Sequence, residues 1–161
     1  KGLVIGKRFH SAPVIRLADA KAMQLGHTVK ADGRWRVFAF CNDQDPAADY
    51  SSLHALCDYL ALSPDSPVRK YTPAGCDIDS VIDVRAVLQQ DHRLLDLEAM
   101  PAFLVPAKGR YGLRDYEKIF CPELKDGNDI FEMRGIDRQQ GCMIVVRPDQ
   151  YAFFDGFLKQ P

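Results

Sequence analysis

The sequence predicts one α/β domain, and three observations carry this prediction. The chain has 161 residues, 47% hydrophobic and 27% charged, which is ordinary globular composition. A chain of this length buries roughly two thirds of its unfolded surface, so one packed core needs no disulfide or metal. Strand-like segments flank a segment with helical spacing, and another strand-like pair follows near the end. We therefore expect residues 1–161 to form a single domain.

The opening section has the composition of strands joined by a tight turn. Asp32-Gly33 stands between two runs rich in β-branched and aromatic residues, in the stretch HTVKADGRWRVFAF. Aspartate followed by glycine between such runs is a strong short-range signal for a hairpin. The sequence therefore predicts an N-terminal β-hairpin extension here.

A helix is predicted to follow this strand. Its apolar face has the i, i+3, i+4, i+7 spacing of a helix and consists of Leu53, Leu56, Cys57 and Leu60. Ser51 or Ser52 can cap the start, and Ser63-Pro64 ends it. A proline-rich loop, SPDSPVRKYTPAG, comes next.

The middle of the chain predicts a strand and then irregular helical pieces. SVIDVRAVLQQ has period two, because Ile82, Val84, Ala86 and Leu88 alternate with Asp83, Arg85 and Val87. Two prolines interrupt DHRLLDLEAMPAFLVPAKG, so it predicts a short helix and then an extended stretch. GLRDYEKIF predicts a helical turn or two.

The last third predicts a short helix and a hairpin. NDIFEMRG begins with an asparagine cap and ends with a glycine, the usual limits of a short helix. GCMIVVRPDQYAFF predicts a strand, a turn at Pro148-Asp149 and a second short strand, with a further helix possible at the end. Hairpin, strand, helix, strand, helical pieces and hairpin is the order of a thioredoxin-like α/β domain.

Cys41 stands at a strand-to-helix junction, where thioredoxins keep a reactive cysteine. A helix N-terminus lowers the pKa of a thiol, but Asn42, Asp43, Gln44 and Asp45 follow in place of a second cysteine, and carboxylates oppose a thiolate. The sequence therefore favours a structural thiol over a redox centre. No C-x-x-C pair occurs among the five cysteines, which suit reduced thiols of a cytoplasmic protein: Cys41, Cys57, Cys76, Cys121 and Cys142.

Other chemistry has little support in the residues. The histidines lack metal-ligand spacing, no serine lies in a G-x-S-x-G elbow, and no G-x-G-x-x-G turn cradles a nucleotide. The cluster Asp77, Asp79 and Asp83 can bind a cation, although a solvated loop is the commoner reading. Arg147 offers an anion site, an interface ion pair, or simply a turn with its charges in water. We assign no catalytic, cofactor-binding or metal residue.

Composition also limits the partners. The formal net charge of −1 gives no basic surface for nucleic acid, and no apolar run reaches the roughly 18 residues of a membrane helix.

Five stretches carry a resemblance that covers almost the whole chain. They are GKRFHSAPVIRLADAKAMQLGHTVKADGRWRVFAF, DIDSVIDVRAVLQQDH, KGRYGLRDYEKIFC, RGIDRQQGCMIVVRPDQY and FFDGFL. In this order they resemble the C-terminal domain of FAD-dependent phenol hydroxylases, the family of phenol 2-monooxygenase and 3-hydroxybenzoate 4-monooxygenase. The resemblance implies a thioredoxin-like fold without a redox dithiol, and a role in dimerisation, with contact through an exposed aromatic patch or sheet edge.

The same resemblance implies a larger parent protein. Such parents bind FAD, use NADPH and O2, and hydroxylate a phenolic ring next to its hydroxyl group. Their flavin motifs and catalytic residues lie in preceding FAD-binding and substrate domains, so the resemblance transfers no catalytic position, and we expect the chain that begins at Lys1 to be a C-terminal fragment. The partners implied are those domains and a second copy of the parent. The alternative is a stand-alone thioredoxin-shaped binding module or thiol redox adaptor.

The chain departs from the family pattern at one point. In relatives the strand after RPDQY continues, and a loop and most of a helix precede the FFDGFL block, whereas here Ala152 runs directly into Phe153. Either this protein has lost that segment, or residues are missing at this point. In the second case the final apolar cluster belongs to a C-terminal helix and not to the last strand.

Overall fold

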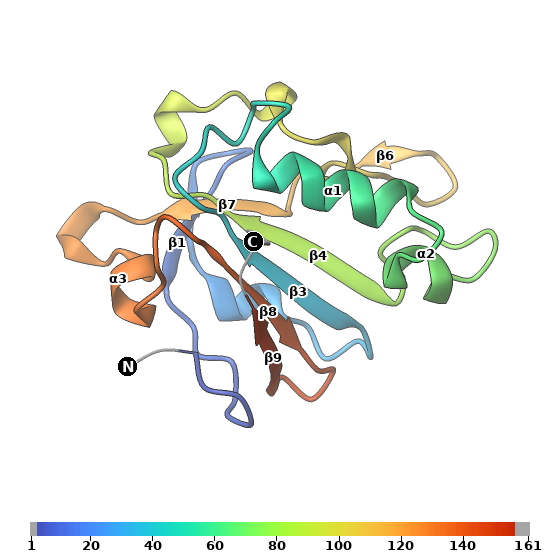
Figure 1. Cartoon of the computed structure of the whole chain (residues 1–161), viewed down its shortest axis with the longest axis horizontal. Helices are drawn as coiled ribbons and strands as arrows, with labels where there is room; N and C mark the ends of the chain where they lie inside the picture. Colours follow the sequence, from blue (N-terminus) through green and yellow to red (C-terminus); the bar gives the residue numbers. More distant parts are fainter. Residues whose placement is uncertain (1–2, 157–161) are drawn as a thin grey trace.

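Two apolar strands form the centre of the fold in the computed structural model, which describes residues 3–156. β3 (Trp35–Phe40) and β4 (Ile82–Val87) pair in parallel along their full length. Parallel neighbours need a crossover connection. α1 (Ser52–Leu62) and α2 (Pro67–Tyr71) provide it and lie beside β4 (Figure 1).

The other strands extend this pair into a seven-stranded mixed sheet with the order β2-β1-β7-β4-β3-β8-β9. β7 is parallel to β4, and all the outer pairings are antiparallel, so β2 and β9 are the edge strands. The bounds of these strands are β1 (Pro13–Arg16), β2 (Lys21–Gln24), β7 (Ile119–Pro122), β8 (Cys142–Val146) and β9 (Ala152–Gly156). A separate small hairpin consists of β5 (Ala107–Lys108) and β6 (Leu113–Arg114).

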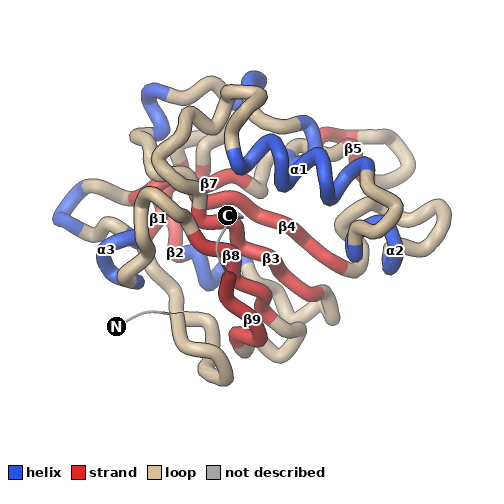
Figure 2. The backbone as a smooth tube through the Cα atoms, viewed as in Figure 1, coloured by secondary structure: helices blue, strands red, loops and turns tan. Residues whose placement is uncertain are grey.

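Short helical turns fill most of the connections. Figure 2 shows that the chain between β4 and β7 is largely loop with brief helical pieces. The remaining helix and the 3-10 turns are α3 (Ile130–Arg134), η1 (Leu25–Thr28), η2 (His92–Leu94), η3 (Leu97–Ala99), η4 (Ala102–Leu104) and η5 (Lys125–Gly127).

The sheet separates two apolar clusters, because side chains alternate between its faces. On the helix face, the side packed by α1, Val84 and Ile119 contact Leu53 and Leu60 and form one cluster. On the far face, the opposite side, the core consists of aromatic and branched residues, among them Phe9, Phe38, Phe40, Phe120, Phe131 and Ile144. Phe9 stacks on Phe38, and Phe40 meets Phe131 edge to face.

Several predicted elements are confirmed. α1 begins where the serine cap predicts, because the Ser51 hydroxyl accepts a hydrogen bond from the backbone N–H of His54. β4 and the β8–β9 hairpin lie at their predicted places. The helix in NDIFEMRG is present as α3, although Asp129 and not Asn128 accepts the capping hydrogen bond.

The predicted hairpin at Asp32-Gly33 is wrong. The segment directly before this turn is the 3-10 turn η1 followed by loop, and β3 pairs with β4 and β8. The Asp32 carboxylate accepts hydrogen bonds from the guanidinium groups of Arg34 and Arg36, so ion pairs hold the turn in place of a partner strand. The N-terminal hairpin is formed earlier in the chain, by β1 and β2.

Three connections also differ from expectation. GLRDYEKIF contains β6 and the start of β7 in place of a helical turn, because β6 pairs with β5 and burial beside β4 favours the extended form of β7. The predicted helix after β4 is divided into separate turns, since the carboxylates of Asp91 and Asp96 each cap a short one. The proline-rich loop contains α2, whose first residue is Pro67, a favoured position for proline.

The end of the described chain is extended. Phe153 to Gly156 belong to β9, so these residues do not begin a C-terminal helix. The further helix considered for the very end lies beyond Gly156, outside the described residues. No helix within residues 3–156 has the length and apolar character needed to cross a bilayer.

Candidate functional site

Cys41 lies in the core, directly after β3. Its side chain is almost completely buried, and the thiol donates to the backbone carbonyl of Ala39. Burial, together with the nearby Cys57 and Cys121, raises the pKa of Cys41 far above its usual range. Burial likewise raises the pKa of Cys57 and Cys121 to about 12. These thiols are protonated packing groups, and Cys41 has no access to a disulfide substrate.

The same junction does not fit a dinucleotide. A phosphate cradle needs a glycine-rich turn between a strand and a helix. Residues 41–51, which join β3 to α1, contain no glycine. A cavity on the far face that is lined by six cationic side chains has a volume of only about 190 Å³. Neither this junction nor that cavity therefore fits the phosphates of FAD.

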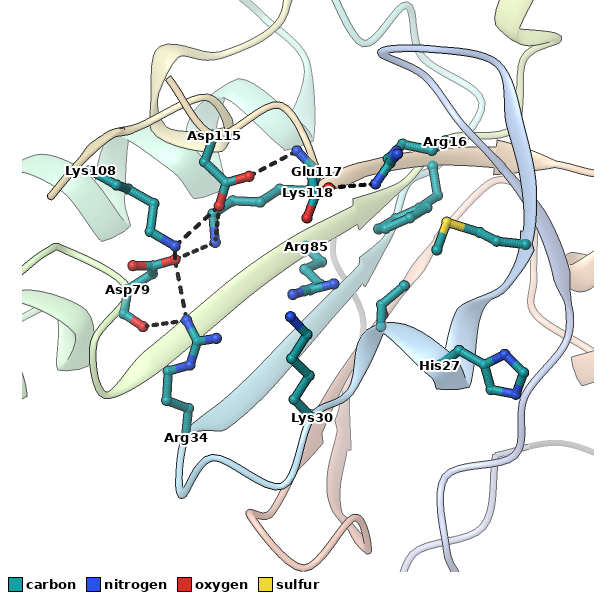
Figure 3. Close-up of a pocket in the computed structure, with 13 residues that line it drawn as sticks. Arg16, His27, Lys30, Arg34, Asp79, Arg85, Lys108, Asp115, Glu117 and Lys118 are labelled. Atoms are coloured by element: carbon teal, nitrogen blue, oxygen red, sulfur yellow. Dashed lines mark hydrogen bonds and ion pairs between the residues drawn. The ribbon is translucent and has the colours of Figure 1, made fainter. Parts of the chain in front are cut away.

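A buried charge network occupies the far face instead (Figure 3). At its centre is Lys118, whose side chain is 3% exposed and whose ammonium donates to Asp79 at 2.6 Å and also to Asp83. Lys108 approaches Asp79 at 2.8 Å and Asp115 at 3.2 Å. The network thus joins the loop before β4, β4 itself, the β5–β6 hairpin and the start of β7.

Arginines of β3 and β4 complete the network. Arg36 is 1% exposed and forms a bidentate pair with Asp32, with both contacts at 2.7 Å. Its Nε lies 3.3 Å from Asp83, which also pairs with Arg85 at 2.9 Å. Removing one partner of such a pair leaves an uncompensated buried charge, so the members depend on one another.

The carboxyl groups of Asp79 and Asp83 are ionised. Burial alone raises the pKa of Asp79, but hydrogen bonds from Lys108 and Lys118 and the charges of both outweigh it and hold that pKa at about 2. Burial also opposes ionisation of Asp83, and the charges of Arg85 and Lys118 keep its pKa below the usual range. The network is therefore a set of ion pairs at neutral pH.

This network corrects the commoner reading of Asp77, Asp79 and Asp83. Asp79 and Asp83 are buried and paired with lysines and arginines, so they are neither a solvated loop nor a cation site. Asp77 accepts a hydrogen bond from the backbone N–H of Gly109. One signal in the sequence could have indicated the charge network: Arg36 and Asp83 stand at inward positions of mainly apolar strands.

The remaining candidates are not brought together. Arg147 pairs with Asp149 within its turn, and both side chains are nearly half exposed, so this is a surface ion pair of small energetic weight. Within residues 3–156, no group of three or more histidine, cysteine, aspartate or glutamate side chains is placed to hold a metal ion.

An apolar groove of about 850 Å³ opens on the helix face, where β8 and β9 are not covered by α1 and α2. We call it the aromatic groove. Its floor comes from β3, β8 and β9 and its wall from α1 and α2, and it includes Trp35, Val145, Phe153, Phe154, Tyr59 and Tyr71. Trp35 and Phe153 meet edge to face, with ring centroids 5.7 Å apart.

A β-bulge puts both phenylalanines of β9 into the aromatic groove. The register between β8 and β9 shifts between Val145 and Val146, so Phe154 pairs with Val145, Ala152 pairs with Val146, and Phe153 is the extra residue. Phe153 is 57% exposed and Tyr71 58%. Exposed apolar surface of this kind marks a place where another molecule or segment binds.

Comparison with known proteins identifies the relatives of the chain. The profile of the family described as "Phenol hydroxylase, C-terminal dimerisation domain" matches residues 1–154. A 3-hydroxybenzoate 4-monooxygenase of Comamonas testosteroni is 56% identical over 98% of this chain and 27% of its own length. An FAD-dependent monooxygenase of Aspergillus terreus is 34% identical over 98% of this chain and 28% of its own length. The chain thus spans about a quarter of these relatives.

The alignment with the Comamonas protein also shows a difference in length. Its 173 positions cover 98% of this chain, or about 158 residues, so about 15 residues of the relative have no counterpart here.

Solved structures support the predicted fold class. The thioredoxin domain of a Bacteroides vulgatus thiol-disulfide oxidoreductase superimposes with a TM-score of 0.54 at 12% identity, over 96% of this chain and 89% of that one. A peroxiredoxin-like protein of Aquifex aeolicus gives 0.55 at 10% identity, over 100% and 82%. At such identities the likeness concerns the fold alone, which is thioredoxin-like without a C-x-x-C pair.

Replacing Lys118 tests the charge network. We expect Lys118→Met to lower the free energy of unfolding by about 3 kcal/mol, because Asp79 and Asp83 lose their shared buried partner. Lys70→Met, at an exposed position on α2, is the matched control and changes stability by less than about 0.5 kcal/mol. Urea unfolding measures both variants, and equal stabilities would show that the network contributes nothing.

Acid should weaken the fold in a defined pH range. The unfolded chain releases the Asp79 proton near pH 4, while the folded chain holds the pKa at about 2. Between these values the unfolded state binds more protons, so stability falls as the pH is lowered, by about 2 kcal/mol for this carboxyl group. Urea unfolding between pH 7 and pH 2 measures the effect. Asp79→Asn should be less stable at neutral pH and lose less on acidification; an unchanged acid dependence contradicts the assignment.

Thiol labelling should separate one cysteine from the others. Cys76 is exposed, whereas Cys41, Cys57 and Cys121 are buried and Cys142 is half-buried with a pKa raised to about 11. An aromatic disulfide reagent should therefore label one thiol of the folded chain rapidly and the other four only on unfolding. Cys76→Ser should abolish the rapid phase. Rapid labelling of Cys41 is the result that would restore the redox reading.

Proposed function

Because the chain belongs to the family of phenol hydroxylase C-terminal dimerisation domains, we propose that it is the dimerising, non-catalytic part of a longer aromatic ring hydroxylase. In this proposal the preceding domains of the parent bind FAD, NADPH and a phenolic substrate, and O2 supplies the oxygen placed next to the ring hydroxyl. The names of the matched monooxygenases and their greater length support it.

The aromatic groove carries this proposal. A domain with its own core and a buried thiol at Cys41 offers the parent a surface, and this groove is an apolar one on the uncovered part of the sheet. Burying an exposed aromatic side chain contributes about 1.5–3 kcal/mol. A few such residues supply the apolar centre that a subunit interface needs.

The shape of the patch suits contact with a second copy. A two-fold interface uses the same surface twice, so that surface must contain both a projection and a recess. Here the aromatic groove is the recess, and Phe153 and Tyr71 of its lining are each more than half exposed and offer the contact to a second copy. We therefore assign this surface to self-association.

The proposal places the protein in the cytoplasm, where its five free thiols stay reduced. A thiol redox adaptor is not favoured, because it needs a low-pKa, accessible thiol, and Cys41 is neither.

Substitutions in the aromatic groove test self-association of the 161-residue chain. The double variant Tyr71→Ser/Phe153→Ser should raise the dimer dissociation constant at least roughly tenfold, because two apolar contacts per subunit are lost. The control is Tyr111→Ser/Leu113→Ser, which removes two even more exposed apolar side chains at the small hairpin. Sedimentation equilibrium measures the constant for each protein.

The two possible failures are distinguishable. A wild-type chain that stays monomeric contradicts dimerisation by this domain. A wild-type dimer that the groove variant leaves intact keeps the function but moves the interface to another surface. Loss of dimerisation in both variants would indicate general damage, and circular dichroism of each variant checks that the fold is retained.

A further inference from the structure

A second cavity, on the far face, contains one cationic group that pairs with no described carboxylate, and an arginine that keeps one guanidinium nitrogen without a partner among the described residues. It is lined by six cationic side chains and three carboxylates, namely Arg16, Lys30, Arg34, Arg85, Lys108 and Lys118 with Asp79, Asp115 and Glu117. Asp19, Asp32 and Asp83 pair with some of these cations from outside the lining. The net charge of the lining therefore does not determine whether an anion can bind. Binding depends on cationic atoms that face the cavity without a carboxylate partner.

Most of these cations are fully engaged. Lys118 and Lys108 share Asp79 and Asp115. Arg16 binds Asp19 and Glu117 through all three guanidinium nitrogens. Arg34 similarly uses its nitrogens on Asp32 and Asp79. None of these side chains has a donor nitrogen without a partner for an added ligand.

Lys30 and Arg85 are different. Arg85 is only 12% exposed and uses Nε and Nη2 on Asp83, at 3.0 and 2.9 Å, which leaves Nη1 without a partner in residues 3–156. Lys30 makes no ion pair or side-chain hydrogen bond with any described residue. Figure 3 shows the Lys30 ammonium pointing toward the Arg85 guanidinium across the cavity.

Two cations that face each other repel, and an anion between them removes the repulsion. A lysine ammonium and an arginine fork are also the groups that bind oxyanions best, through charge-assisted hydrogen bonds. The cavity volume of about 190 Å³ is smaller than that of a cofactor pocket and suits a group of a few atoms.

We propose that this cavity binds a small oxyanion, held between the Lys30 ammonium and Nη1 of Arg85. The oxyanion is either a free ion such as inorganic phosphate or the carboxylate of another protein segment, since both present negatively charged oxygens to the same two donors. The site lies on the face of the sheet opposite the aromatic groove, so it does not depend on the proposed interface.

Titration of the 161-residue chain with inorganic phosphate, at an ionic strength held constant with chloride, tests the site. We expect saturable chemical-shift changes at Lys30 and at the Arg85 side chain, and a rise in the thermal midpoint with phosphate concentration. Lys30→Gln should weaken binding roughly tenfold, because one charge-assisted contact is lost. Lys70→Gln, an equally conservative change on exposed α2, should bind like the wild type.

Arg85→Lys serves as the second variant, since it keeps a cation beside Asp83 but removes the Nη1 donor, and it should also weaken phosphate binding. A parallel titration with acetate distinguishes the sources. Binding of both anions supports a carboxylate-accepting site, and binding of phosphate alone supports a free tetrahedral ion. The proposal is overturned if neither anion gives a saturable change, or if Lys30→Gln binds phosphate as tightly as the wild type.

Discussion

The ion pairs of Lys118 with Asp79 and Asp83 determine how the centre of the sheet is assembled. They bring together the loop before β4, β4 itself and the residue directly before β7. The backbone carbonyl of Lys118 also accepts a hydrogen bond from the N–H of Ala86. The ion pairs and this backbone hydrogen bond therefore fix the same register between β4 and β7. A shift by one residue would turn the ammonium toward the apolar helix face, at a large cost in free energy.

With the register fixed, the two faces of the sheet carry different side chains and are covered to different extents. Charged and aromatic residues of β3 and β4 fill the far face, where the N-terminal segment and α3 cover them. Alternation then sends Trp35 and Val145 to the helix face, where only part of the sheet is covered. The aromatic groove and the oxyanion cavity therefore lie on opposite sides of the sheet, and each can be occupied without displacing the other.

Local signals in the sequence predicted the elements that local interactions determine. The Ser51 cap and the apolar spacing of α1 are complete within one segment, and the alternation of β4 is visible in six residues. β7 has four consecutive buried residues and no alternation, so only its neighbours reveal it as a strand. The turn at Asp32-Gly33 misled for a related reason, because the partners of Asp32 are side chains and not a second strand.

The candidate sites were less predictable, because their members come from distant parts of the chain. Lys118 and Asp83 are 35 residues apart, and nothing in either neighbourhood indicates the other. Contact through an exposed aromatic patch or a sheet edge was expected, but the residues that line the aromatic groove belong to six separate elements. The role of Cys41 was easier to predict, since the missing second cysteine already argued against redox chemistry. Burial of Cys41 supplies the physical reason.

The bulge in β9 separates a residue of the buried core from residues of the outer surface. Ala152, before the bulge, belongs to the far-face core, whereas the bulged residue Phe153 and the following Phe154 contribute to the outer surface. A bulge absorbs a change in chain length without disturbing the pairing that precedes it. A substitution at Phe153 or Phe154 therefore changes the outer surface of the domain while its interior core stays the same.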